Sequence, residues 1–181
     1  MNPIFITLEG IEGSGKSTNI KVINDYLDKK NIDYINTREP GGSDVGDHLR
    51  DILLNTEKKL SNETELLLML ADRVNHIETL ISPSLNNGIT VISDRYMDSS
   101  YAYQGGGREM GLSNIRRIAD NLNIIQPNLT LLFDLPVEMA LERARSRSKL
   151  DRFESEEIDF HQKIRDTYLL LAEEDKEKIQ I

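Results

Sequence analysis

Nine consecutive residues, from Gly10 to Thr18, have types and spacing that suit phosphate chemistry. They are Gly10, Ile11, Glu12, Gly13, Ser14, Gly15, Lys16, Ser17 and Thr18, which fit the pattern G-x-x-x-x-G-K-[ST]. The glycines let the backbone curl so that successive N–H groups point inward at phosphate oxygens. Lys16 adds a positive charge near the β- and γ-phosphates, and the hydroxyl of Ser17 can hold Mg²⁺. The segment indicates a nucleoside-triphosphate site, and a glycine-rich turn that merely begins a helix is the weaker explanation.

A second part of such a site follows the apolar run of residues 89–93. That run ends at Asp94, and Arg95 comes directly after it. A carboxylate at the end of a buried strand can hold Mg²⁺, either directly or through water. An Asp-Arg pair alone is common, but the phosphate-binding pattern upstream makes the combination informative. Arg95 is expected to enter the same crevice.

The segment from Asp98 to Arg108 is unusual in composition. Small hydroxyl side chains, two tyrosines and the amide of Gln104 gather there, just downstream of the predicted site. Such side chains suit the lining of a pocket for a flat heteroaromatic ligand with polar edges. The alternative, a helix end followed by a glycine-rich loop, accounts for the three glycines but not for the polar and aromatic side chains.

Two further arginines, Arg38 and Arg73, can each be interpreted as a ligand contact or as an ordinary structural residue. Arg38 lies in the predicted loop 37–43, where it is either a phosphate contact or an ion-pair partner of Glu39. Met69 and Arg73 are four residues apart and so share a helix face. By spacing alone, the usual reading of that pair is a core methionine and a solvated arginine.

One stretch is strongly positive. Five cations fall within ten residues, namely Arg143, Arg145, Arg147, Lys149 and Arg152. Phosphoryl transfer spreads negative charge over the transferred group, and a guanidinium placed over that group accelerates the reaction. A mobile arginine-bearing flap over residues 143–154 would also exclude water. We favour this lid over the alternative of a solvated helix.

Composition limits the possible partners. The chain has 181 residues and a formal charge of −9, which argues against a nucleic-acid polymer as partner. No apolar run is long enough for a membrane span, and without a basic-then-apolar segment near the start we do not expect an export leader. The absence of cysteine fits the cytoplasm. The histidines His48, His76 and His161 have no metal-ligand spacing and are expected at the surface or on helix faces.

The order of apolar segments predicts one α/β domain with three layers around a parallel sheet. We expect strands over 4–8, 32–36, 89–93, 129–135 and 178–181, and helices over 15–30, 45–54, 64–85, 112–123, 137–148 and 155–174. Helical spacing is expected to turn these side chains toward the core: Leu49, Ile52, Leu53, Leu66, Leu67, Leu70, Val74, Ile77, Leu80 and Ile81. Arg50 is left on a helix flank.

From end to end, the chain resembles bacterial thymidylate kinases, which belong to the P-loop nucleoside monophosphate kinases. The resemblance rests on Leu8–Thr18, Thr37-Arg38-Glu39-Pro40-Gly41-Gly42, Asp94-Arg95-Tyr96 and Ser99–Gly105. It implies a P-loop fold with a five-stranded parallel sheet. It also implies transfer of the γ-phosphoryl group of ATP to dTMP, giving dTDP and ADP, with Mg²⁺ held at Ser17 and Asp94.

The resemblance also implies roles for single residues. Residues 10–18 and Arg143 would bind ATP, and Glu12 would approach the acceptor sugar and the metal region. Arg95, helped by Arg73 and Arg38, would hold the dTMP phosphate. Arg50, Ser100 and Gln104 would read the thymine edge, and Tyr103 would exclude a ribose 2′-hydroxyl.

The same resemblance places the transition-state arginine on the lid, because the phosphate-binding loop carries Glu12 and Ser14 rather than arginine. Arg147 is the first choice for that role, which makes Lys16, Glu12, Arg95 and Arg147 the catalytic set. A homodimer is implied as well. Met69 stands where many relatives carry a phenylalanine against the thymine ring. The chain stops at Ile181, where relatives continue through an adenine-contacting loop and another helix.

Two alternatives differ in the ligand they require. A P-loop kinase for another pyrimidine nucleotide would turn over dCMP or UMP as well as dTMP, and Tyr103 with Gln104 argue against it. A nucleotide-binding switch without an acceptor would explain the phosphate-binding loop and Asp94. It would leave Arg50, Arg73, Arg95 and Ser100–Gln104 without a task.

Overall fold

The computed structural model describes residues 2–56, 59–146 and 151–181. Its centre is a sheet of five parallel strands in the order β2-β3-β1-β4-β5. The strands are β1 (Phe5–Glu9), β2 (Tyr34–Arg38), β3 (Thr90–Asp94), β4 (Leu129–Leu132) and β5 (Ile179–Gln180). This confirms the α/β class, the parallel sheet and the fifth strand near the C-terminus.

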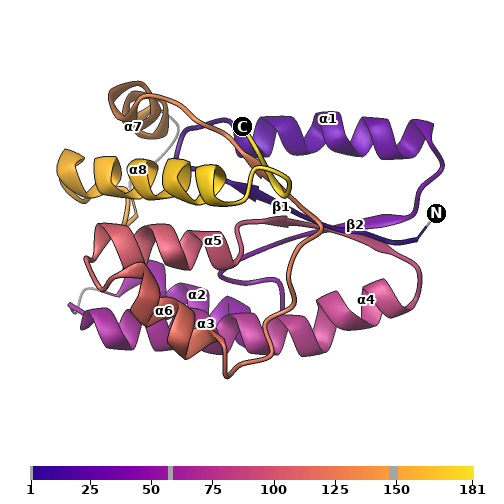
Figure 1. Ribbon diagram of the computed structural model, residues 1–181, viewed down its shortest axis with the longest axis horizontal. Helices are drawn as coiled ribbons and strands as arrows, with labels where there is room; N and C mark the ends of the chain where they lie inside the picture. Colours follow the sequence, from indigo (N-terminus) through magenta and orange to yellow (C-terminus); the bar gives the residue numbers. More distant parts are fainter. Residues whose placement is uncertain (1, 57–58, 147–150) are drawn as a thin grey trace.

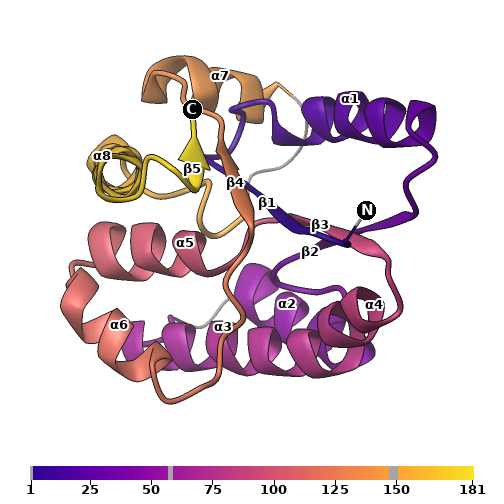
Figure 2. The same cartoon turned by 45° about the vertical axis from the view of Figure 1, so that its right-hand side comes forward.

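Helices cover both faces of the sheet (Figures 1 and 2). On one side lie α1 (Lys16–Lys29), α7 (Val137–Arg145) and α8 (Ile158–Glu174). On the other lie α2 (Asp44–Asn55), α3 (Asn62–His76), α4 (Ser82–Asn86), α5 (Met97–Ser100) and α6 (Leu112–Ala119). Two π-helical segments, η1 (Ile77–Ile81) and η2 (Tyr101–Gly107), continue α3 and α5. The predicted helix 64–85 is therefore continuous from Asn62 to Asn86, through α3, η1 and α4.

Side chains alternate between the two faces of the central strands and so contribute to two apolar clusters. Ile6 and Leu8 of β1 and Ile92 of β3 pack with Leu27 of α1. Their neighbours on the opposite face, Phe5 and Val91, pack against α3 and α6 through a second cluster. Because both faces of β1 and β3 are covered, these strands carry almost continuous apolar runs, as expected for a buried parallel sheet. The carboxyl ends of β1, β2 and β3 are thereby fixed side by side.

The segment η2 is a wide helical turn, whereas one interpretation of the sequence was a glycine-rich loop at this position. A side chain at Gly106 would collide with Thr167 of α8, because a Cβ atom there would lie 2.0 Å from Oγ1 of Thr167. Glycine is therefore needed for close approach of α8, not for loop flexibility. Single π turns of this kind occur frequently at functional sites.

The structure corrects several details. Strand β2 begins at Tyr34 and continues through Arg38, so Thr37 and Arg38 are not loop residues. Ile52 and Leu67 are 46% and 60% exposed, although their spacing predicted core positions. His76 and His161 lie on helices, which is one of the two expected positions, but both are fully buried rather than at the surface.

Four predicted elements are shorter than expected by three residues or more. Helix α6 ends at Ala119, before a segment in which Asn123 has a φ of 50°, and strand β4 ends at Leu132. Helix α8 begins at Ile158 rather than 155, and α7 ends at Arg145. Residues 147–150 lie outside the described residues, so the structure says nothing about Arg147 or Lys149.

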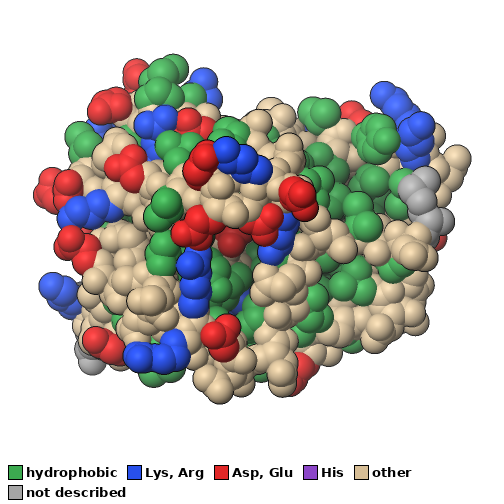
Figure 3. Space-filling view, in the orientation of Figure 1, with side chains coloured by type: hydrophobic (Ala, Val, Ile, Leu, Met, Phe, Trp, Pro, Cys, Tyr) green, Lys and Arg blue, Asp and Glu red, His purple; other side chains and the backbone are tan. Residues whose placement is uncertain are grey.

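Charges of both signs are interspersed on the face shown in Figure 3, without a broad basic field. That distribution agrees with the net charge of −9. Among the helices of the described ranges, none combines the length and apolar character that crossing a membrane requires.

Candidate active site

The phosphate-binding loop leaves β1 and enters α1 through three glycines with left-handed backbone angles. Gly10, Gly13 and Gly15 have φ values of 134°, 77° and 105°, which L side chains rarely adopt. The ammonium group of Lys16 donates hydrogen bonds of 2.9 and 3.0 Å to the carbonyls of Gly10 and Ile11. Burial and the neighbouring charge of Arg95 lower the pKa of Lys16 to about 8. The loop thus folds around a buried ammonium group.

Ser17 and Asp94 line the same cavity as this loop. Oδ1 of Asp94 is buried and has no hydrogen-bond partner within the described ranges. Within those ranges, no cluster of three or more His, Cys, Asp or Glu side chains could by itself enclose a metal ion. A hydroxyl and one free carboxylate oxygen suit Mg²⁺ that takes its other ligands from phosphate and water.

Arg95 has a left-handed backbone, with a φ of 74°, at the end of β3. The chain turns sharply there and aims the guanidinium group back across the sheet end. That group donates hydrogen bonds to Oε1 of Glu12 at 2.8 Å, to Ser99 at 3.2 Å and to Tyr168 at 3.3 Å. It also lies 4.9 Å from the ring centre of Tyr103. Four segments of the chain therefore fix one cation.

Glu12 receives a second short hydrogen bond, of 2.6 Å, from the hydroxyl of Tyr103. Burial acts against its ionisation, but the charges of Arg95 and Lys16 outweigh burial and lower the pKa of Glu12. Its other oxygen, Oε2, is buried without a partner within the described ranges. Glu12 is therefore an ionised acceptor at neutral pH with one oxygen free.

Glu9, the last residue of β1, lies behind these groups and is fully buried. Its carboxylate accepts from the hydroxyls of Ser99 at 2.6 Å and Tyr168 at 2.9 Å, and from the backbone N–H of Tyr96 at 2.8 Å. Burial and the charge of Asp98 raise the pKa of Glu9 to about 7. The carboxylate holds the hydroxyl groups that in turn contact Arg95.

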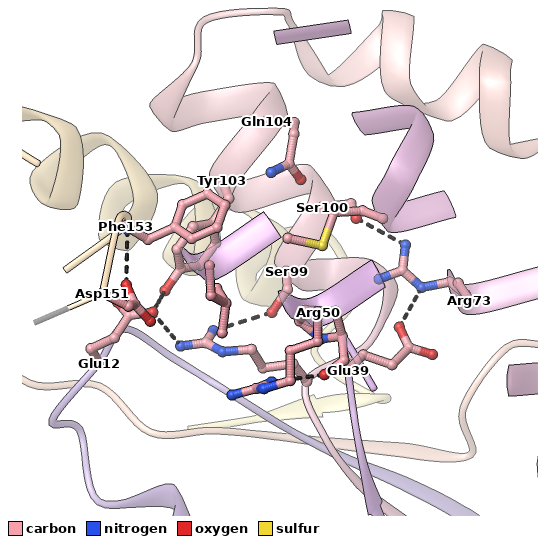
Figure 4. Close-up of a pocket in the computed structure, with 14 residues that line it drawn as sticks. Glu12, Glu39, Arg50, Arg73, Ser99, Ser100, Tyr103, Gln104, Asp151 and Phe153 are labelled. Carbon is pink, nitrogen blue, oxygen red and sulfur yellow. Dashed lines mark hydrogen bonds and ion pairs between the residues drawn. The ribbon is translucent and has the colours of Figure 1, made fainter. Parts of the chain in front are cut away.

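A cavity of about 520 Å³ opens beside Arg95 (Figure 4). Glu12 and Asp151 lie on one side of it, and Arg73 and Glu39 lie on the other. Its walls are formed by Glu12, Glu39, Pro40, Arg50, Leu54, Met69, Arg73, Arg95, Ser99, Ser100, Tyr103, Gln104, Asp151 and Phe153. All but one of the side chains expected to bind the acceptor nucleotide are therefore in one place; the exception is Arg38.

Arg73 is almost entirely buried, so the reading of a solvated arginine was wrong. Its guanidinium group donates to Oε2 of Glu39 at 2.7 Å, to Ser100 at 2.8 Å and to the carbonyl of Tyr96 at 2.8 Å. The other oxygen of Glu39 lies 2.9 Å from Nδ1 of His76. One carboxylate thus fixes both a cavity arginine and a buried histidine.

Arg38 and Arg50 flank the cavities differently. Arg38 pairs with Asp47 across 3.6 Å and is 56% exposed, so the ion pair with Glu39, one of the two alternatives for Arg38, is wrong. The reason is that Glu39 turns inward to Arg73 after the strand ends. Arg50 donates to the carbonyl of Pro40 at 2.7 Å and lines the cavity wall.

A second, larger cavity of about 1270 Å³ adjoins the first. It is lined by residues of the phosphate-binding loop together with Arg38, Asp94 and Arg143. The two cavities share five lining residues, namely Glu12, Glu39, Arg50, Arg95 and Asp151. Two ligands placed in them would meet at Arg95 and Glu12.

Sequence reasoning missed that three carboxylates hold side chains of the site, those of Glu9, Glu39 and Glu65. Each is buried, at 0%, 3% and 1% exposure, and each holds a side chain that faces a cavity. Glu9 carried a signal that could have been used, because it stands at the end of an apolar strand where an unpaired carboxylate is costly.

Comparison with known proteins gives consistent results. A sequence model described as thymidylate kinase matches residues 8–181. The thymidylate kinase of Vesicomyosocius okutanii is 46% identical over 179 residues, which cover 98% of this chain and 87% of that protein. That of Carboxydothermus hydrogenoformans is 47% identical over 176 residues, covering 97% and 87%. The crystal structure of thymidylate kinase from Ehrlichia chaffeensis is similar with a TM-score of 0.81 and 30% identity, covering 99% of this chain and 88% of that chain.

Proposed function

The chain belongs to the thymidylate kinase family and so transfers the γ-phosphoryl group of ATP to dTMP, and we propose that its two adjoining cavities hold these substrates end to end. The observation that carries this assignment is that both cavities are lined by Arg95 and Glu12. A displacement at phosphorus needs the acceptor oxygen close to and in line with the transferred group. Shared walls supply that proximity.

On the donor side, the backbone N–H groups of residues 10–18 and the ammonium group of Lys16 bind the triphosphate. Arg143, which lines the larger cavity, lies along the path of the nucleotide. Mg²⁺ held by Ser17 and Asp94 would neutralise charge on the phosphates. Support for this metal site comes from the buried, unpartnered oxygen of Asp94.

On the acceptor side, Arg95 holds the 5′-phosphate of dTMP, because its guanidinium group contacts the phosphate-binding loop through Glu12. Arg73 bonds to Ser100 instead. We therefore assign Arg73 to the base end, together with Ser100 and Gln104, rather than to the phosphate as the resemblance implied. Arg38 stands at the rim of the larger cavity, where it helps to neutralise phosphate charge.

The remaining wall residues fit the nucleoside part of dTMP. Met69 packs its thioether against one face of the thymine ring. Tyr103, tied to Glu12 by its hydroxyl, fills the space that a ribose 2′-hydroxyl would need. Arg50 closes the wall beside the base. An amide whose carbonyl oxygen accepts from the base N–H discriminates strongly against a base that presents an acceptor there.

Three further features belong to the proposal. Arg147 supplies the transition-state guanidinium from the lid. Two copies of the chain associate through a groove lined by Leu67, Leu70, Ala71, Val74, Asn75, Glu78, Ile118 and Leu122, which leaves apolar surface exposed on α3. The reaction is assigned to the cytoplasm, a reducing compartment with which a chain without cysteine is compatible.

One coupled assay tests the proposal against its alternative. ADP release is measured with dTMP, dUMP, dCMP and UMP as acceptors, and dTMP is expected to give the highest kcat/KM. Arg95→Ala is expected to lose most activity while ATP binding survives. Similar turnover with dCMP or UMP would favour a kinase for another pyrimidine, and equal turnover without an acceptor would contradict the kinase assignment.

A further inference from the structure

Glu65 has no role in the mechanism above, although it lies against the base end of the cavity. It belongs to the first turn of α3 and is 1% exposed. A carboxylate removed from water to this degree must be paired and hydrogen-bonded to be tolerated. Its partners therefore indicate what it does.

Within the described ranges, three side chains converge on this carboxylate. Arg152 approaches Oε2 at 2.7 Å, and Arg108 donates to both oxygens at 3.2 and 3.3 Å. The third partner is Gln104, whose Nε2 donates to Oε1 at 2.9 Å. Gln104 lines the cavity, whereas Glu65 does not. The cluster thus connects a cavity side chain to a fixed charge outside the cavity wall.

This contact settles which end of the Gln104 amide faces the ligand. An amide carries a donor and an acceptor of similar size, so an unconstrained glutamine can turn either end toward a base. A carboxylate paired with two guanidinium groups offers only acceptors, and it can therefore hold the NH₂ end alone. The carbonyl oxygen of Gln104 is left for the ligand.

We propose that Glu65 is a specificity-determining positioning residue, which fixes Gln104 so that its carbonyl oxygen demands an N–H donor from the base. Thymine carries such a donor at N3, whereas N3 of cytosine is an acceptor. Cytosine would bring two acceptors together in a buried site, and it would have no donor for the oxygen. This inference rests on the proposed role of Gln104 at the base end.

The test compares acceptors that differ in one property each. 5-Methyl-dCMP keeps the methyl group of dTMP and changes only the hydrogen-bonding edge, whereas dUMP keeps the edge and lacks the methyl group. With Glu65→Gln, either end of the Gln104 amide can be held. We expect the kcat/KM ratio of dTMP to 5-methyl-dCMP to fall about tenfold or more. The ratio of dTMP to dUMP should stay unchanged.

Glu156→Gln is the matched control, because Glu156 pairs with Arg108 but does not contact Gln104. It is expected to leave both ratios unchanged. An unchanged ratio of dTMP to 5-methyl-dCMP in Glu65→Gln would overturn the inference. A parallel fall in both ratios would overturn it too, since a generally loosened cavity would then be the cause.

A second measurement covers the case in which Glu65→Gln does not fold. In a crystal structure of the wild-type protein with dTMP, N3 of thymine should lie within hydrogen-bond distance of Oε1 of Gln104, with Nε2 still on Glu65. A base held by Nε2 of Gln104 instead would overturn this inference and leave the proposed function standing. A thymine base bound far from Gln104 would contradict the proposed site itself. So would a wild-type enzyme with equal kcat/KM for dTMP and 5-methyl-dCMP.

Discussion

The hydroxyl of Tyr103 lies 2.6 Å from Oε1 of Glu12, the same oxygen that the guanidinium group of Arg95 approaches at 2.8 Å. A side chain of the acceptor cavity, a residue of the phosphate-binding loop and the arginine between the cavities therefore meet at one atom. The position of Glu12 depends on both partners, and the two can be separated by mutation.

Tyr103→Phe removes the hydrogen bond and keeps the ring. A hydrogen bond to a charged group contributes about 1.5–3 kcal/mol, so kcat should fall about tenfold or more as Glu12 loses its anchor. The preference for dTMP over ribothymidine monophosphate should survive, because the ring still fills the space. Steady-state kinetics with both acceptors checks this, and Tyr101→Phe serves as the control. A lost sugar preference at unchanged kcat would contradict the assignment.

The pKa of Lys16, lowered to about 8 by burial and by Arg95, predicts proton uptake on nucleotide binding. Phosphate oxygens favour the charged ammonium group and raise the pKa of Lys16 again. Above pH 8 the free protein has partly lost this proton and must take it up to bind ADP. Calorimetric titration in buffers of different ionisation enthalpy should show uptake that grows between pH 7.5 and 9. Binding with no proton uptake at pH 9 would be incompatible with this role.

The pKa of Glu9, raised to about 7 by burial and by Asp98, predicts a pH dependence of stability. Between about pH 4.5 and 7 the folded state keeps a proton that the unfolded state has released, so stability falls as pH rises through this window. The variant Glu9→Gln has no ionisable group at this position, so its stability does not decrease for this reason as pH rises. Its free energy of unfolding relative to wild type should rise between pH 5 and 8 by up to roughly 3 kcal/mol.

Urea unfolding at both pH values measures that difference for Glu9→Gln. The exposed carboxylate of Glu177 provides the control, and Glu177→Gln should show no such trend. If the free energy of unfolding of Glu9→Gln relative to wild type fell as pH rises, the pKa of Glu9 would be lowered rather than raised, and the prediction would be contradicted.

Met69→Ala tests whether the thioether packs against the acceptor base. Met69 is half-buried without a ligand. Full burial of a methionine is worth about 1.5–3 kcal/mol, and a base that covers the exposed half would gain about half of that, so KM for dTMP should rise about tenfold while KM for ATP changes little. Met139→Ala is the matched control, because Met139 is 48% exposed on α7. If Met69→Ala and Met139→Ala changed KM for dTMP equally, the assignment of Met69 to the base site would be wrong.

The lid prediction separates two arginines. Arg147→Ala should lower kcat by roughly 10³ with little change in KM for dTMP, since a transition-state guanidinium acts mainly on the chemical step. Arg143→Ala should instead raise KM for ATP, because Arg143 lines the donor cavity. An unaltered kcat in Arg147→Ala would transfer the role to another lid residue.

The site residues could be predicted where they form continuous segments with their own spacing. Residues 10–18 and Asp94-Arg95 carry their chemistry in short stretches of sequence, and the strand before each stretch fixes its place in the sheet. The groups that hold them could not be predicted in this way. Glu39 pairs with Arg73 across 34 positions and Glu65 with Gln104 across 39, and no local pattern encodes such pairs.

The sequence pattern also failed to predict the solvent exposure of some side chains. Leu67 and Ile52 have helical spacing with core residues, yet both are exposed, since spacing indicates a face but not what covers it. His76 shows the reverse, because its burial depends on Thr37 and Glu39, which are distant in sequence.

The contact between Gly106 and Thr167 has a consequence for how relatives of this protein can change. The hydroxyl of Tyr168, next to Thr167, lies within hydrogen-bond distance of both Arg95 and Ser99. A methyl group added at Gly106 would push α8 away and pull this phenol from the guanidinium group. A smaller residue at 167 would not relieve this contact completely, because the backbone carbonyl oxygen of Lys163 would still lie 3.1 Å from the added atom. Glycine is therefore expected at 106 in homologues that keep the phenol beside the guanidinium group, although Gly106 lines neither cavity.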